Sequence, residues 1–126
     1  MNHALATAGL LGATAVLAGA FGAHSLDDIV TSDRLEIWRT AAQYHLIHSV
    51  VMLVISLLDE NRYGMLVCWA TIALASGIVL FSFSLYALVL TDLEGFAMVT
   101  PLGGVLLIGS WLLLAYMATI SKKPAK

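Results

Sequence analysis

Four long stretches without a charged side chain constrain this chain more than any other feature of its sequence. Asp, Glu, Lys and Arg are absent from residues 1–26, 40–58, 63–91 and 95–121. Each stretch can supply the roughly 20 apolar residues that a helix needs to cross a bilayer. Because lipid offers the backbone no hydrogen-bond partner, an open chain can cross it only as helices. The spacing of the charges therefore predicts an all-α fold, a four-pass transmembrane helix bundle.

The composition favours the same class of protein. Hydrophobic residues make up 60% of the chain and charged residues only 11%, whereas soluble domains are about half apolar and a quarter charged. The 126 residues suit a single transmembrane domain, residues 1–126, with helices at about 3–23, 33–58, 63–90 and 96–120. A net charge of -2 argues against a nucleic-acid partner. The single cysteine, Cys68, excludes an internal disulfide and a cysteine-rich metal site.

The basic residues predict the orientation of the bundle. An even number of spans places both termini and the loop between the second and third helices on one side. That side carries Arg62, Lys122, Lys123 and Lys126. The opposite side carries Arg34 and Arg39 together with most of the acidic residues. Since loops rich in Lys and Arg stay in the cytoplasm, we expect both the N-terminus and the C-terminus to be cytoplasmic.

A cleaved signal peptide is the competing interpretation of the N-terminal stretch. The small residues Ala18, Gly19 and Ala20 resemble a signal-peptidase site, and an apolar stretch precedes them. No Lys or Arg comes before that stretch, however, so the basic region of a signal peptide is missing. We therefore expect the first helix to be retained.

The first helix carries a stripe of small residues at alternating spacings of four and three. These residues are Ala8, Gly12, Ala15, Gly19 and Gly22. Helices in a membrane associate where small residues let their backbones come close. The stripe predicts that the first helix lies in the middle of the bundle.

The second helix is expected to begin at a capping box formed by Asp33 and Glu36. Its length then exceeds the hydrocarbon core of about 30 Å. We therefore expect Trp38 and Arg39 at headgroup level, as an interfacial aromatic residue and a snorkelling cation.

Polar side chains from all four expected helices fall in the outer leaflet, while the cytoplasmic halves are mostly aliphatic. The residues are His24, Arg39, Gln43, Tyr44, His45, His48, Ser82, Ser84, Tyr86 and Thr100. Such side chains are costly in hydrocarbon, so they face the bundle interior, pair with one another or line a wet cavity. One hypothesis is a single polar site that opens outward and binds or moves something. The other is that these side chains hydrogen-bond between helices and only hold the bundle together.

More specific chemistries are less well supported by these residues. His45 and His48 lie one turn apart and His24 could approach them, but no cysteine or carboxylate completes a metal shell at that depth. Two histidines on one helix suit bis-histidine haem ligation poorly. No Asp or Glu lies within a span to take part in proton transfer, and Ser82 and Ser84 lack the context of a nucleophile. We therefore expect no metal, no cofactor and no catalytic residue, so the chain is not expected to be an enzyme.

The same residues resemble a known family of small four-helix membrane proteins, domain of unknown function 423. The segments that carry the resemblance are residues 19–24 (GAFGAH), 40–48 (TAAQYHLIH), 77–86 (GIVLFSFSLY) and 100–111, which begins TPLGG and ends at Trp111. The family usually has a glycine where this chain has Phe83. The resemblance implies a four-pass protein of the bacterial inner membrane and supplies no activity. The family's motif residues coincide in position with the polar cluster. In this chain they are Gly22, His24, Gln43, His45, His48, Ser82, Ser84, Tyr86, Thr100, Pro101 and Gly104.

Two functions follow as expectations. The first is that the polar cluster binds or passes a small polar solute, an ion or a lipid headgroup, with the protein acting as a homo-oligomer. The alternative is a non-catalytic accessory or structural subunit of a larger membrane complex. An intramembrane enzyme comes third. In each case we expect the lipid bilayer as a partner, and we expect no nucleic-acid partner.

Overall fold

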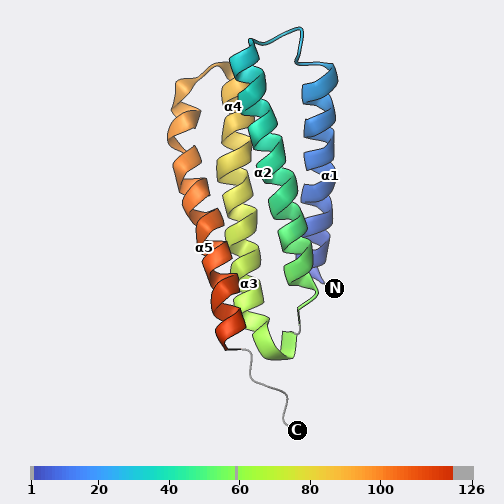
Figure 1. The fold of residues 1–126 in the computed structure, drawn as a ribbon, viewed down its shortest axis with the longest axis vertical. Helices are drawn as coiled ribbons and strands as arrows, with labels where there is room; N and C mark the ends of the chain where they lie inside the picture. The colour runs from blue at the N-terminus through green and yellow to red at the C-terminus, as the bar shows by residue number, and fades with distance from the viewer. Residues whose placement is uncertain (1, 59, 121–126) are drawn as a thin grey trace.

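The computed structural model describes residues 2–58 and 60–120, and all regular secondary structure in this part of the chain is helical (Figure 1). The elements are α1 (His3–His24), α2 (Ser32–Ser56), α3 (Glu60–Ile78), the π-helix η1 (Val79–Phe83), α4 (Ser84–Thr91), the 3-10 helix η2 (Glu94–Met98) and α5 (Thr100–Thr119). Because α3, η1 and α4 follow one another as one rod, these residues form four long antiparallel rods. The prediction of an all-helical fold is confirmed for these residues.

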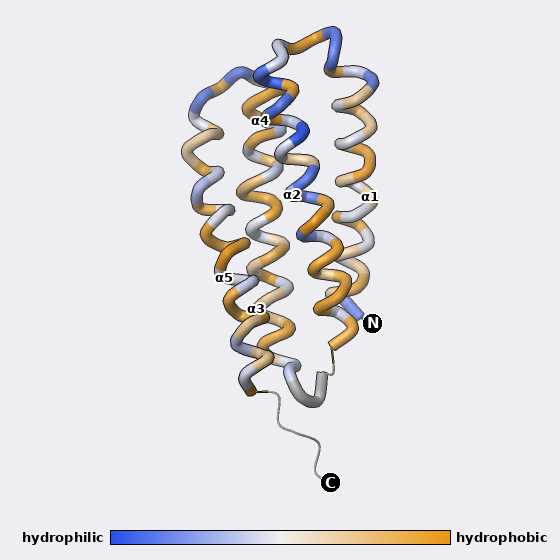
Figure 2. Tube along the Cα trace, viewed as in Figure 1, coloured by the Kyte–Doolittle hydropathy of each residue, from blue (hydrophilic) through white to orange (hydrophobic). Residues whose placement is uncertain are grey.

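Three of the four rods are long and apolar enough to cross a membrane by length and composition: His3–His24, Tyr63–Thr91 and Glu94–Thr119. The remaining helix, α2, has 25 residues but carries polar residues in its first half. Figure 2 shows this hydrophilic segment along the half of α2 nearest the α1–α2 connection. We call this end of the molecule the loop end, since the connection from α4 to η2 also lies there (Figure 1).

The two central rods are α2 and the α3–η1–α4 rod. α1 packs against α2, and α5 packs against α3 and η1, so α1 and α5 lie at opposite edges. The expectation that the first helix lies in the middle of the bundle is therefore wrong. Of its small residues Ala8, Ala15 and Gly22 are buried, but Gly19 is exposed and a Cβ added there would meet no atom within 4 Å.

The start of α2 also differs from the expectation. Its N-cap is Thr31, whose hydroxyl accepts a hydrogen bond from the backbone N–H of Arg34 at 3.4 Å. Asp33 is already inside the first turn, where its charge is favourable beside the helix dipole. Threonine and aspartate both cap helices well, so the local sequence offered two nearby starts.

Trp38 is buried at the loop end of the bundle, with 5% of its surface exposed. Its indole N–H donates to the carbonyl of Ala18 at 2.8 Å, and its ring packs 4.4 Å from that of Tyr86. Gly22 makes room for it, because a Cβ at that position would lie 2.5 Å from the indole Cδ1. Trp38 thus joins α1, α2 and α4 from within and is not a lipid-facing interfacial residue.

The sequence analysis did not predict η1, the π-helical turn where the backbone of α5 packs closely against the α3–η1–α4 rod. A Cβ on Gly103 of α5 would lie 2.3 Å from the backbone nitrogen of Phe81. On the other side, a Cβ on Gly77 would lie 2.6 Å from Leu107 Cδ2. Phe83, the departure from the family pattern, is exposed and does not obstruct this approach. Close backbone packing therefore fixes the position of α5 along the rod.

This contact predicts opposite effects for two glycines of α5. Gly103→Ala should lower the free energy of unfolding by about 1–3 kcal/mol, because the backbone of η1 leaves no room for a methyl group. Gly109 has nothing within 4 Å of an added Cβ, so Gly109→Ala should be neutral or stabilise the helix by roughly 0.5–1 kcal/mol. Thermal unfolding of both variants in detergent measures the difference. Equal stability of the two would contradict the close contact.

Candidate functional site

The ten predicted site residues do not form one cluster in the structure. They divide into a buried hydrogen-bonded group, a groove between α2 and α5, and a pair that joins α4 to α5. His24 and Arg39 lie on exposed surface outside these three groups.

The buried group is centred on His45 of α2, which is 1% exposed. Its Nδ1 lies 3.3 Å from the Tyr86 hydroxyl of α4, and its Nε2 lies 3.4 Å from the Thr14 hydroxyl of α1. A neutral imidazole has one N–H donor and one acceptor nitrogen, so these two hydroxyls satisfy both positions. His45 therefore joins three helices and has no ring nitrogen left for a solute.

His48 is 6% exposed and also uses both ring nitrogens. Nδ1 lies 2.7 Å from the carbonyl oxygen of Tyr44, and Nε2 accepts a hydrogen bond from the indole N–H of Trp111 at 3.3 Å. A carbonyl can only accept and an indole can only donate, so the ring is neutral with its proton on Nδ1. This hydrogen bond crosses from α2 to α5.

A groove of about 580 Å³ lies between α2 and α5, on the side of His48 that the buried group does not occupy. It is lined by Gln43, Tyr44, Ile47, His48, Phe81, Gly104, Leu107, Ile108 and Trp111. The Tyr44 ring stacks on Phe81 with 4.6 Å between the ring centroids. Gln43 and Tyr44 are both exposed, so their side chains can reach a molecule that enters from outside the bundle.

The third group joins α4 to α5 at the loop end. The hydroxyls of Ser84 and Thr100 lie 2.8 Å apart, and the Ser84 hydroxyl also lies 2.9 Å from the carbonyl oxygen of Phe81. Ser82, in η1, is fully buried, and its hydroxyl has no hydrogen-bond partner within the described part of the chain. The two serines therefore have different surroundings, although they are only two residues apart.

The two outlying residues are placed differently from one another. His24 is the last residue of α1, ten residues beyond Thr14 and so about 15 Å further along the helix than the contact to His45. It does not approach the other histidines as a third ligand. Arg39 lies one helical turn before Gln43 on α2, so the two exposed side chains share a face. Among residues 2–58 and 60–120, no group of three or more His, Cys, Asp or Glu side chains is placed to hold a metal ion.

Three contributors to these groups were missed by reasoning from the sequence. Trp111, Phe81 and Thr14 are not among the ten candidate residues that the sequence indicates. Trp111 closes a family segment of the sequence, and that was the available signal for it. A lone threonine in an apolar helix gives no signal, because its hydroxyl can bond to its own helix, as Thr14 does with the Leu10 and Leu11 carbonyls at 3.0 Å.

Long apolar helices that enclose paired polar side chains define a small helical membrane protein, and comparison with known proteins identifies its family. Residues 18–104 match the family described as "Protein of unknown function (DUF423)". The chain belongs to this family, which confirms the resemblance seen in its motifs.

The relatives are membrane proteins of similar length. The chain is 40% identical over 105 residues to the UPF0382 membrane protein YwdK of Bacillus subtilis, covering 82% of this chain and 85% of that protein. It is 44% identical over 100 residues to a UPF0382 membrane protein of Staphylococcus epidermidis, covering 79% and 81%. It is 36% identical over 99 residues to the UPF0382 inner membrane protein YgdD of Escherichia coli, covering 79% and 76%. No solved structure matches the chain. The chain is accordingly a protein of the bacterial inner (plasma) membrane.

The hydrogen bond between His48 and Trp111 predicts a measurable coupling. Trp111→Phe removes the indole donor and should lower the free energy of unfolding by about 0.6 kcal/mol, and by about 1.7 kcal/mol at most, as for other hydrogen bonds between membrane helices. In a His48→Leu background the same change should have no such effect. Trp69→Phe, at an exposed position of α3, is the matched control. Additive effects of the His48 and Trp111 substitutions on thermal unfolding would contradict the hydrogen bond.

Proposed function

We propose that the chain crosses the plasma membrane four times, with both termini in the cytoplasm. α2 lies along its length between α1 and the rod formed by α3, η1 and α4, so it shares their path through the bilayer. Its most costly polar side chains, His45 and His48, are buried and hydrogen-bonded, which lowers the cost of placing them in lipid.

The charges support this orientation from the loop end. Arg34, at the start of α2, forms ion pairs with Asp92 and Glu94, which follow α4. The acidic residues at the loop end, Asp27, Asp28, Asp33, Glu36, Asp92 and Glu94, outnumber Arg34 and Arg39, so this end carries no excess of cations. The lysines that favour a cytoplasmic C-terminus, Lys122, Lys123 and Lys126, lie outside the described residues, so their argument remains one of sequence.

Topology reporters test the four-pass arrangement. A reporter fused after Lys126, or inserted between Asp59 and Arg62, should be cytoplasmic, and one inserted at Asp28 should be external. A phosphatase and fluorescent-protein pair measures both sides. An external C-terminus would refute the arrangement, since it requires either an odd number of spans or the opposite orientation.

We propose further that the protein binds the phosphate-bearing headgroup of a membrane lipid at the groove between α2 and α5. The observation that supports this most directly is the groove itself, which exposes Gln43 and Tyr44 at the side of the bundle and not in its interior. In the proposed orientation this part of α2 lies in the outer leaflet, just below the headgroups. A side groove at that level faces lipid.

The same geometry argues against passage of a solute or ion. The imidazoles of His45 and His48 have both nitrogens engaged within the protein. Beyond His48 toward the other end of α2, the groove side is lined by aliphatic residues such as Val51 and Ile55. A polar solute would meet mostly aliphatic side chains along that path, and its desolvation would be costly.

Two side chains on one face of α2 fit the headgroup chemistry. Arg39 is exposed one turn above Gln43, and a guanidinium binds phosphate oxygens through charge-assisted hydrogen bonds. Gln43 can donate from its amide to an ester carbonyl one turn deeper. We propose a binding role without catalysis, since no serine hydroxyl in the described part of the chain is hydrogen-bonded to an imidazole.

Binding of a water-soluble phospholipid tests the headgroup site. Native mass spectrometry of the full chain in detergent, titrated with dihexanoyl phosphatidylglycerol, should detect a bound lipid. Arg39→Gln or Gln43→Leu should weaken this binding by about tenfold or more, since each removes a strong hydrogen bond. Thr40→Val is the matched control, because Thr40 is exposed on α2 but lines a depression on the other side, beside Leu85.

Absence of binding, or equal binding by all variants, would refute the headgroup site. The same spectra report oligomeric state, which tests the predicted homo-oligomer. Stable co-purification with a larger complex, together with an empty groove, would support the alternative role of an accessory subunit.

A further inference from the structure

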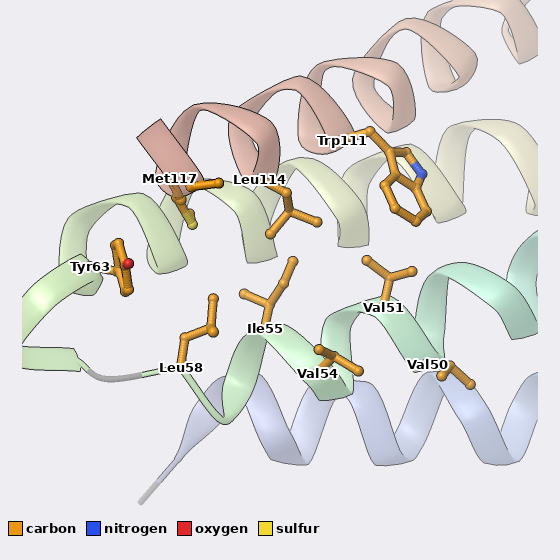
Figure 3. Close-up of a pocket in the computed structure, with 10 residues that line it drawn as sticks. Val50, Val51, Val54, Ile55, Leu58, Tyr63, Trp111, Leu114 and Met117 are labelled. Atoms are coloured by element: carbon orange, nitrogen blue, oxygen red, sulfur yellow. The ribbon is translucent and has the colours of Figure 1, made fainter. Parts of the chain in front are cut away.

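The groove that receives the proposed headgroup continues into a second, apolar groove. This lower groove has a volume of about 420 Å³ and is lined by Val50, Val51, Val54, Ile55, Leu58, Tyr63, Trp111, Leu114, Met117 and Ala118 (Figure 3). Trp111 lines both grooves. In Figure 3 its indole projects from α5 toward Val51 of α2, at the boundary between the two.

We infer that the lower groove holds one acyl chain of the lipid whose headgroup binds above it, an inference that rests on the proposed headgroup site. Nothing in the described chain covers this groove. α5 packs on α3 and η1, and α2 packs on α1 and on the rod formed by α3, η1 and α4. α2 and α5 therefore face each other across the groove. Val50, Val54 and Trp111 are 51%, 57% and 49% exposed. The groove is thus open along its side to whatever surrounds the helices, which in a bilayer is lipid.

The order of side chains along this face of α2 matches the order of groups in a phospholipid. A cation, Arg39, is followed by an amide, Gln43, and then by the aliphatic residues Ile47, Val50 and Val54 at successive turns. The positive charge complements a phosphate, the amide complements an ester, and the aliphatic stretch complements a hydrocarbon chain. A phospholipid therefore fits this face of α2 in one direction, with its headgroup beside Arg39.

The dimensions suit a single chain. A water-sized group, which a methylene resembles, takes about 30 Å³, so 420 Å³ accommodates on the order of a dozen methylenes. From Gln43 to Leu58 the two grooves follow α2 over fifteen residues, or about 22 Å at 1.5 Å per residue. This is within a hydrocarbon core of about 30 Å.

A helix from a second copy fits this groove less well. Membrane helices meet over small residues that allow close backbone approach. The lower groove has Val, Ile, Leu and Met side chains with an indole across its upper end, and Ala118 is its one small residue. A helix about 10 Å across would be held away by these side chains, whereas a flexible chain can lie between them.

Chain length provides the test on the unmodified protein. Native mass spectrometry in detergent, with palmitoyl lysophosphatidylglycerol and its hexanoyl counterpart as probes, should show the palmitoyl lipid binding at least about tenfold more tightly, because it buries more methylenes. Equal affinity for the two would overturn the acyl-chain inference and leave the headgroup site standing. Failure of both lipids to bind would overturn both.

Groove-filling variants localise the chain. Val54→Trp and Ala118→Trp place an indole in the lower groove and should abolish the advantage of the palmitoyl lipid while leaving hexanoyl binding unchanged. Ala115→Trp is the matched control, because Ala115 is exposed on α5 but lines neither groove. It should keep the wild-type preference. Retention of the preference in both filled variants, or a shift from dimer to monomer on filling with no change in lipid preference, would overturn the inference.

Discussion

A polar group inside a membrane bundle must find its hydrogen-bond partner within the protein, and the rest of this structure depends on how the two central histidines meet that requirement. Hydrophobic burial does not drive helices together in lipid, because the tails are as apolar as the side chains. His45 reaches hydroxyls on α1 and α4, and His48 reaches the indole of α5. Two residues of α2, one turn apart, therefore contact all three of the other rods and set their relative positions.

This use of the histidines also determines which polar groups remain available for function. With both imidazoles satisfied internally, the exposed polar side chains at the same level of α2 are Gln43 and Tyr44 on the groove. An amide in contact with hydrocarbon lacks a partner, and a lipid ester or phosphate supplies one. Under the proposed headgroup site, the two hypotheses from the sequence, structural hydrogen bonds and a binding site, apply to different members of the same set of residues. His45 and Tyr86 fit the first, and Arg39 and Gln43 fit the second.

The sequence predicted the helices because charge spacing and apolar length are direct consequences of bilayer thickness, and it predicted a polar end because depth follows from position along a helix. It could not predict which helices touch. The small-residue stripe of α1 indicated a packed face, but a stripe does not say whether one neighbour or three cover it, and here α2 alone covers most of it. Trp38 was expected at the interface because its burial depends on Gly22, which lies sixteen residues earlier in the sequence and on another helix. η1 has no sequence signature, since the extra residue of a π-turn leaves the apolar composition unchanged.

The groove exists because of that unpredicted turn. Gly103 rests against the backbone of η1 and Gly77 against Leu107, so α5 is held close to the α3–η1 rod at two points a turn apart. Trp111 lies eight residues beyond Gly103, about 12 Å along α5, where its indole can reach His48 without α5 itself moving onto α2. If α5 were free to slide or tilt, its aliphatic side chains would close over Val51 and Ile55. Tight packing on one side of α5 is therefore what keeps its other side apart from α2, and the hydrogen bond from Trp111 to His48 spans the gap where the polar and apolar halves of the groove meet.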